Sequence, residues 1–318
     1  MTSRRQFVRE LGLGALSGMA LSGIAGAQES SAPILEKAPE PLPTVQFGPH
    51  RITRLIVGGN PFVANSHFSN EWNRDMADYF TPEQVVQTLG RCEQVGINTL
   101  QARGDFHRIM YWVELFRRSG GKLQFIAQTA SEMQDIHQNI RILAEFGAIG
   151  VYFHGSMSDR LWLAGEIDKA RDYLKTMRDA GVRVGFASHI PEVLHYVEEK
   201  GWDLDFYMVP FYNLTTRKIQ PGESIPGQFK FNEEIFHPDD PPLFCDFIRR
   251  TSRQCLAYKV LAAGRKCSTQ EDVKEAFRWA FSQIKPTDCV VVGMFPKYAD
   301  QPLLDARYVV EAVKSLKS

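Results

Sequence analysis

The feature that most constrains the fold is a regular alternation between short apolar runs and longer segments with helical periodicity. Each run is followed by polar residues or glycine, and the runs cover residues 52–57, 99–100, 123–127, 150–153, 182–187, 206–211, 256–263 and 289–292. Such alternation is typical of a parallel sheet with helical crossovers. Eight strand–helix units in about 260 residues predict a closed (β/α)8 barrel, the TIM-barrel fold.

Local signals place several of the helices between these runs. Pro82 follows Thr81 and fits the first position of a helix. The stretch Ser-Thr-Gln-Glu at residues 268–271 is expected to cap a helix that continues to about residue 281, and Ser131 to open the helix through Ile140. An open, doubly wound sheet is the alternative fold, but no G-x-G-x-x-G motif follows the first run.

The first residues differ in kind from the rest. Arg4 and Arg5 precede an apolar run over residues 11–25, and Ala25-Gly26-Ala27 fits a cleavage site for a signal peptidase. This order predicts a twin-arginine signal peptide over residues 1–27, a disordered linker over 28–43 and a barrel domain over 44–318. We therefore expect a periplasmic protein that meets the twin-arginine export machinery and contacts the membrane only through its leader.

Charge and cysteine content exclude several classes of function. Lys plus Arg and Asp plus Glu number 37 each, so no net field attracts nucleic acid. The five cysteines show neither framework spacing nor a C-x-x-C pair, so buried free thiols are expected rather than disulfides or a thiolate zinc site. The segment 214–242, rich in Pro and Gly, is expected to be a lid over the site or else a surface excursion.

Short motifs recur in the order and spacing of a known family. They are residues 96–98, 152–154, 185–188, 211–213, 276–281 and 291–293. In this order the chain resembles the aldo-keto reductases, which are (β/α)8 barrels that use a nicotinamide cofactor. The resemblance covers most of the mature chain and implies the same barrel.

The catalytic tetrad of that family is mostly missing. Gln101 stands where the resemblance places Asp, Phe106 where it places the proton-donating Tyr, and Thr129 where it places Lys. Only the substrate-orienting His survives, as His154, while His107 beside Phe106 is a candidate replacement acid. Because a Phe cannot donate a proton, and such assistance is worth about 10²–10⁴-fold in rate, a different reaction is favoured.

The resemblance also implies cofactor contacts. Ser188 stands against the expected nicotinamide, and Lys297 and Arg307 follow the last strand, where the phosphate of NADP would bind. Exposed, solvated charges are the alternative for the two cations. An exported protein would need to hold such a cofactor tightly.

Polar residues gather at the predicted carboxyl ends of the strands, where barrel active sites lie. They are Asn60, Gln101, Arg103, Asp105, His107, Gln128, His154, His189, Tyr212, Asn213 and Lys259. Asn60, Gln101, Gln128, Tyr212 and Asn213 are the candidate substrate-binding residues, for a hydroxyl-rich small molecule such as a sugar derivative. The other six are the candidate catalytic residues.

Lys259 is the first of these candidates, because its place in an apolar run should lower its pKa. A structural ion pair, with Asp105 for example, is the alternative. His154 and His189 end neighbouring strands and could move a proton, or bind a divalent metal with Asp105 or His107. Arg103 suits a carboxylate or an oxyanion. The histidines at 50, 67, 137, 195 and 237 are expected to be surface or packing residues.

Three functions follow from these residues. The leading hypothesis is an exported barrel enzyme that acts by acid–base chemistry on a small carbonyl or sugar-like substrate, as a lyase, isomerase or epimerase. The second is an NADP-dependent oxidoreductase with a rearranged proton donor. The third is a non-catalytic, sugar-binding protein on the same scaffold.

Overall fold

The computed structural model describes residues 40–105, 108–225 and 234–316. Eight parallel strands close into a barrel in the order β10-β3-β4-β5-β6-β7-β8-β9. They are β3 (Leu55–Gly58), β4 (Thr99–Arg103), β5 (Gln124–Gln128), β6 (Gly150–Phe153), β7 (Arg183–Ala187), β8 (Phe206–Pro210), β9 (Gln254–Tyr258) and β10 (Cys289–Gly293). The prediction of a (β/α)8 barrel is confirmed.

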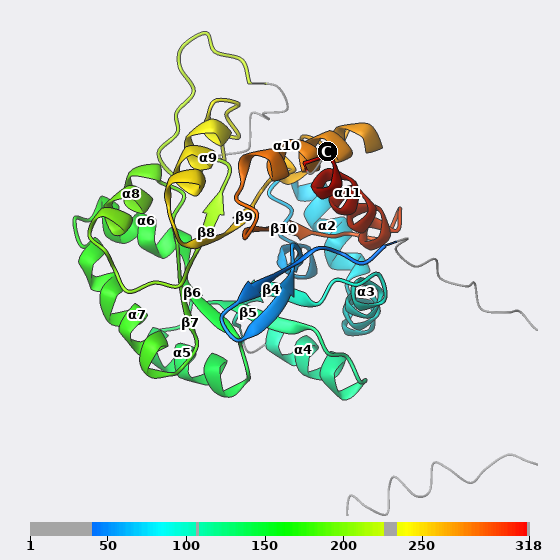
Figure 1. Cartoon of the computed structure of the whole chain (residues 1–318), viewed down its shortest axis with the longest axis horizontal. Coiled ribbons are helices and arrows are strands. Elements are labelled where there is room, and N and C mark those ends of the chain that lie inside the picture. The colour runs from blue at the N-terminus through cyan, green and yellow to red at the C-terminus, as the bar shows by residue number, and fades with distance from the viewer. Residues whose placement is uncertain (1–39, 106–107, 226–233, 317–318) are drawn as a thin grey trace, which may run out of the picture. The chain divides into compact units, whose positions relative to one another are not determined.

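Helices surround the barrel in the order of the strands that precede them (Figure 1). They are α2 (Asn70–Tyr79), α3 (Pro82–Gln94), α4 (Ile109–Arg118), α5 (Ile136–Glu145), α6 (Gly155–Leu163), α7 (Ala170–Asp179), α8 (Pro191–Glu199), α9 (Asp240–Arg250), α10 (Gln270–Gln283) and α11 (Gln301–Ser315), with the 3-10 helices η1 (Asn60–Val63), η2 (Ile167–Lys169) and η3 (Ala262–Gly264). Within the described part of the chain, no helix is long and apolar enough to cross a membrane.

The expected helix starts are right at two places and wrong at one. The Thr81 hydroxyl accepts from the Gln84 N–H at the start of α3, and Thr269 forms a reciprocal capping box with Asp272 at the start of α10. The helix expected to open at Ser131 begins instead at Ile136, because the side chain of Asp135 provides its cap.

An antiparallel hairpin packs against the interior of the barrel. Its strands are β1 (Thr44–Phe47) and β2 (His50–Thr53). Phe47 and Ile52 of the hairpin belong to the same apolar cluster as inward residues of the barrel, and the ring centres of Phe47 and Phe206 are 5.0 Å apart. The first expected strand, 52–57, therefore divides into parts of two strands. Ile52 belongs to β2 of the hairpin, and the first strand of the barrel, β3, begins at Leu55.

The inward residues of the barrel alternate along each strand, as pleated strands require. Gly185 lies between two large inward side chains, and a Cβ there would lie 2.3 Å from Cζ of Phe206 and 2.6 Å from Cβ of Tyr152. Gly185 is therefore the residue that lets both aromatic rings fill the interior.

All five cysteines are free thiols, and four of them are buried while Cys267 is exposed. The leader 1–27 and most of the linker 28–43 lie outside the described residues. At the end of that linker Leu42 is buried, and the Pro43 carbonyl accepts from the Arg54 N–H at 2.8 Å.

Candidate functional site

Three side chains from three different elements form a hydrogen-bonded chain at the carboxyl ends of the strands. The Tyr258 hydroxyl at the end of β9 lies 3.1 Å from Nε2 of His189, which follows β7. Nδ1 of His189 lies 2.9 Å from Oδ2 of Asp159 on α6. The Asp159 carboxylate also accepts from the hydroxyls of Ser188, at 2.6 Å, and Thr215, at 2.7 Å. The hydrogen-bonded chain thus runs from Asp159 through His189 to Tyr258, and its last group is the phenol of Tyr258.

The protonation of this chain follows from its surroundings. Burial alone would raise the pKa of Asp159, but hydrogen bonds from His189, Ser188 and Thr215 outweigh burial and lower that pKa. Burial holds the pKa of Tyr258 well above its usual value. The ionised Asp159 accepts a hydrogen bond from the Nδ1–H of His189, and in that tautomer Nε2 of the imidazole accepts a hydrogen bond from the Tyr258 hydroxyl.

His154 directly follows β6 and is the N-cap residue of α6. Its Nδ1 accepts from the Ser156 N–H at 3.1 Å, which leaves the proton on Nε2 when the ring is neutral. Burial, and then the nearby His189 and Arg103, lower the pKa of His154 to about 4. The ring is therefore neutral at pH 7 and can donate one hydrogen bond from Nε2.

Lys259 directly follows the last residue of β9 and adopts a left-handed backbone conformation, with φ 62°. The expectation that it lies inside a strand is wrong, because β9 ends at Tyr258. The expected lowering of its pKa is present: burial lowers the pKa of Lys259 to about 8, against the opposing charge of Glu234. Its Nζ lies 5.8 Å from the ring centres of both Phe236 and Tyr258.

His67 also lies at the barrel mouth, so its assignment as a surface or packing residue needs correction. Its Nδ1 lies 2.7 Å from the Glu234 carboxylate, and its Nε2 lies 3.1 Å from Nδ2 of Asn60. Burial alone would raise the pKa of Glu234, but the bond to His67 and the charges of His67 and Lys259 lower it to about 2. Burial lowers the pKa of His67, so the pair is a carboxylate with a neutral imidazole. Glu234 belongs to the expected lid, 214–242, of which residues 226–233 lie outside the described part.

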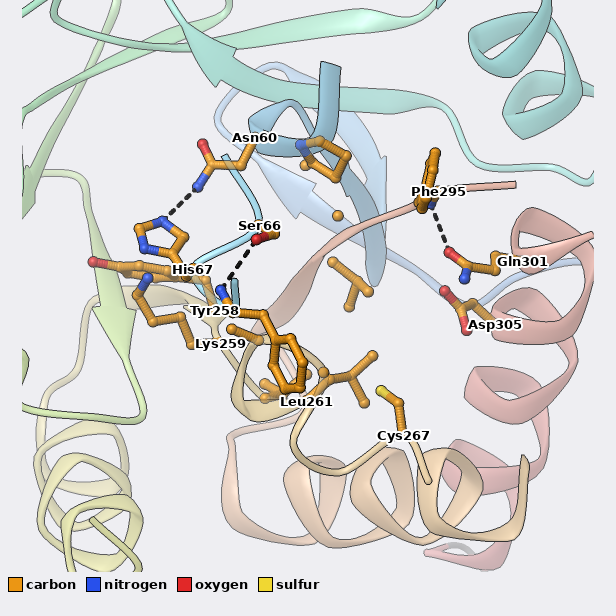
Figure 2. A pocket seen from close by; sticks show the side chains of 18 of the residues that line it. Asn60, Ser66, His67, Tyr258, Lys259, Leu261, Cys267, Phe295, Gln301 and Asp305 are labelled. Carbon is orange, nitrogen blue, oxygen red and sulfur yellow. Dashed lines mark hydrogen bonds between the residues drawn. The ribbon is translucent and has the colours of Figure 1, made fainter. Parts of the chain in front are cut away.

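A cavity of about 540 Å³ begins at these residues and runs outward between the segments that follow β9 and β10 (Figure 2). Its polar lining includes Asn60, Ser66, His67, Gln101, Tyr258, Lys259, Gln270, Gln301 and Asp305. Its apolar lining includes Trp72, Met76, Leu261, Val273, Val292, Phe295 and Leu304. In Figure 2, Lys259 and His67 lie on one side, and Gln301 and Asp305 on the other. The volume suits one small organic molecule.

Some of the candidate substrate-binding residues line the cavity, and the others lie outside its lining. Asn60 and Gln101 line the cavity, and Nε2 of Gln101 donates to the Tyr152 hydroxyl at 2.7 Å. Gln128 ends β5 and is half-buried. Tyr212 is buried, with its ring centre 5.0 Å from that of Phe236, and burial raises its pKa to about 12.

Two further candidates, Asn213 and Asp105, hold backbone segments in place by accepting hydrogen bonds from N–H groups. Oδ1 of Asn213 accepts from the N–H groups of Thr215 and Thr216, so it holds the turn that delivers Thr215 to Asp159. Asp105 accepts from the N–H groups of Arg108 and Ile109 and thus holds the first turn of α4.

Arg103 ends β4, close enough to His154 to affect its charge, and its guanidinium lies 3.0 Å from Glu132 and 3.5 Å from Asp105. The alternative pairing of Asp105 with Lys259 is therefore replaced by one with Arg103. No three His, Cys, Asp or Glu residues in the described ranges form a group that could hold a metal ion, so His154, His189 and Asp105 are not brought together as a metal site. His107 lies outside the described residues.

The residues predicted to hold a cofactor do not line the cavity. The Ser188 hydroxyl is buried against Asp159, Lys297 pairs with Asp75, and Arg307 lies on α11 away from the described lining. Of the described lining residues, Lys259 is the only Lys or Arg, and Asp305 occupies the far end. The described lining therefore does not fit the phosphates of NADP.

No protein-family description and no curated protein matches the sequence. Solved structures of other barrels are similar in shape. The glycerol dehydrogenase of Gluconobacter oxydans, an aldo-keto reductase, is 12% identical with a TM-score of 0.47, over 86% of this chain and 94% of that one. The N-acetylmannosamine-6-phosphate 2-epimerase of Clostridium perfringens is 10% identical with a TM-score of 0.44, over 82% and 92%. An archaeal fructose-1,6-bisphosphate aldolase is 12% identical with a TM-score of 0.46, over 81% and 93%. At such low sequence identity, these similarities concern the fold alone.

The sequence analysis missed Tyr258, Asp159, Tyr152 and Glu234. Tyr152 and Tyr258 each stand two residues after an inward residue of their strand, Gly150 and Leu256, so strict two-residue alternation would have placed both inside the barrel. Asp159 carried no such signal, because it is one of several polar residues on α6.

Proposed function

We propose that this chain is an enzyme that moves protons on a small carbonyl-bearing or sugar-like substrate, as an isomerase, epimerase or lyase does. The observation that carries the proposal is the chain from Asp159 through His189 to the Tyr258 hydroxyl, which ends at a cavity large enough for such a molecule. Barrel enzymes react at this face.

In one direction the hydrogen-bonded chain from Asp159 to Tyr258 removes a proton from the substrate. Tyr258 passes its hydroxyl proton to Nε2 of His189 as it takes a proton from the substrate. The imidazolium that forms lies beside the ionised Asp159, which stabilises it. Because burial makes a lasting tyrosinate costly, Tyr258 conducts the proton rather than storing the charge.

In the other direction the chain delivers a proton. Once His189 carries both protons, Nε2 donates to the Tyr258 oxygen, and the phenol proton is free to move to a substrate carbon or oxygen. Such reversible transfer suits a reaction that takes a proton from one position and returns it at another. Lys259 lies beside Tyr258, and its cation would stabilise an enolate oxygen formed on the way.

The altered pKa values at the mouth favour an enzyme over a passive binding protein. The pKa is lowered to about 8 at Lys259, to about 4 at His154 and to about 2 at Glu234, whereas a binding pocket requires no such tuning. These shifts support the catalytic interpretation over the sugar-binding alternative.

The direct test is hydrogen–deuterium exchange. The purified mature chain is incubated in D2O with a panel of aldoses, ketoses and small hydroxyketones, and deuterium incorporation next to the carbonyl is followed by NMR. We expect exchange with at least one compound, and Tyr258→Phe should reduce its rate by about 10²–10⁴-fold.

Tyr207→Phe is the matched control, because Tyr207 is also buried but bonds to Glu198 outside the barrel mouth. Its exchange rate should match that of the wild type. If Tyr258→Phe exchanges as fast as Tyr207→Phe, the proposed chain is not the proton path. If the wild type exchanges only when NADPH is added, the oxidoreductase alternative replaces this proposal.

A further inference from the structure

The cavity has two polar ends that differ in charge. One end holds Tyr258, His67 and Lys259, the only lysine or arginine among its described lining residues. The other end holds Gln301 and Asp305 on α11, and Figure 2 shows these two side chains across the cavity from Lys259. The lining between the ends is largely apolar, with Leu261, Phe295 and Leu304 among its residues.

Asp305 has an unusual environment for a carboxylate. Its residue surface is only 5% exposed, yet its side chain lines the cavity. Over residues 40–105, 108–225 and 234–316 it has no hydrogen-bond or ion-pair partner. Burial raises its pKa to about 8. A buried carboxyl group without a partner is costly, so such a group is retained where a bound molecule completes it.

Among the residues that the structure describes, the side-chain NH2 group of Gln301, beside the Asp305 carboxyl group, has no hydrogen-bond partner. Its Oε1 accepts from the Phe295 N–H at 2.6 Å, and this bond fixes the amide at the cavity wall. Asp305 and Gln301 are four positions apart on α11, so both lie on the helix face that borders the cavity. The far end is therefore built from two oriented side chains on a rigid element.

We propose that the Asp305 end is a subsite for the remote part of the substrate, and that it binds a hydrogen-bond donor, best a cationic amine, carried on an apolar body. The proposal rests on the proposed function only for the orientation of the substrate, with its reacting head at Tyr258. An anionic group does not fit this end, because the described lining there holds the Asp305 carboxyl group and no Lys or Arg side chain. The preferred substrate is then an elongated molecule: an oxygen-rich head, an apolar middle and a donor at its tail.

Two matched probes test the subsite: phenyl β-D-glucopyranoside and its 4-(aminomethyl)phenyl counterpart, which differ only in the amine. Calorimetric titration of the wild type at about pH 8.5, where Asp305 is mostly ionised, should show about tenfold tighter binding of the amine, as expected for one charge-assisted hydrogen bond. Asp305→Asn should abolish this preference and leave binding of the phenyl probe unchanged. Glu311→Gln, a charge removed from the outer surface of α11, should keep the preference.

Unchanged binding of the phenyl probe shows that Asp305→Asn is folded, and a second variant checks that both probes occupy this cavity. Leu304→Trp narrows the apolar middle of the cavity and should weaken both probes together. Equal binding of the two probes to the wild type, no binding of the amine at millimolar concentration, or a preference that survives Asp305→Asn contradicts the proposal. Displacement of the amine probe by NADPH also contradicts it.

The outcome is independent of catalysis. Tyr258→Phe should lose proton exchange yet keep the preference for the amine, because the two ends of the cavity act separately. If no compound exchanges protons but the preference persists, the proposed reaction fails and the subsite stands. If exchange occurs without any preference, the subsite fails and the reaction stands.

Discussion

The hydroxyl of Tyr258 lies 3.1 Å from Nε2 of His189, although the two residues are 69 positions apart in the chain. They belong to strand ends that β8 separates, so each reaches the other across the mouth of the barrel. The contact joins an ionised carboxylate to a phenol at the cavity through one imidazole. The candidate chemistry depends on this contact more than on any single residue.

Asp159→Asn should stop proton transfer through Asp159, His189 and Tyr258 without leaving a cavity at position 159. The amide keeps the volume but cannot stabilise a charged His189, so proton exchange should fall by about 10²-fold or more. The folded variant should keep its affinity for substrate, since Asp159 lies behind His189. NMR exchange rates and calorimetry on the same sample separate the two effects. A variant with unchanged exchange would show that His189 works without its carboxylate.

Lys259 should give the reaction a pH limit. Its pKa is near 8, so the ammonium is present below that pH and is lost as pH rises through it. If the cation stabilises an oxyanion, the exchange rate should decline above pH 8. Lys259→Met should reduce the rate at every pH, whereas Lys259→Arg should remove the decline, because arginine stays charged. A rate that rises above pH 8 would instead assign Lys259 as a base.

Gly185→Ala should destabilise the fold. The new Cβ would lie 2.3 Å from Cζ of Phe206 and would press on Tyr152, so we expect a loss of about 1–3 kcal/mol in the free energy of unfolding. Gly90→Ala is the matched control, because a Cβ there meets nothing within 4 Å on α3 and should stabilise the helix by up to about 1 kcal/mol. Urea denaturation of both variants measures the difference, and equal stabilities would mean that the interior is looser than the structure indicates.

Export should depend on the arginine pair. We propose that residues 1–27 direct the folded barrel through the twin-arginine route into the periplasm. Replacing Arg4 and Arg5 by lysine together should leave the chain in the cytoplasm, since a receptor reads the pair itself and not only its charge. Cell fractionation followed by immunoblotting checks this. A double variant that still reaches the periplasm would assign the leader to another route.

The sequence determined the architecture of this protein. Alternation of apolar runs and helical segments gave eight strands in the right order, because each segment's periodicity reports its own secondary structure. The same pattern brought His154, His189 and Lys259 to the carboxyl ends of their strands. Local signals were weaker where one residue decides the boundary: Asp135 rather than Ser131 begins α5, and β9 ends at Tyr258.

Only the tertiary structure decided which of these polar groups act together. Asp159 reaches His189 because α6 packs beside the end of β7, and Tyr258 faces His189 because the barrel closes. His67 and Asp305 join the cavity from segments on either side of it. Hydrogen bonds and burial depend on distances in space between residues far apart in sequence, and no local pattern encodes those distances.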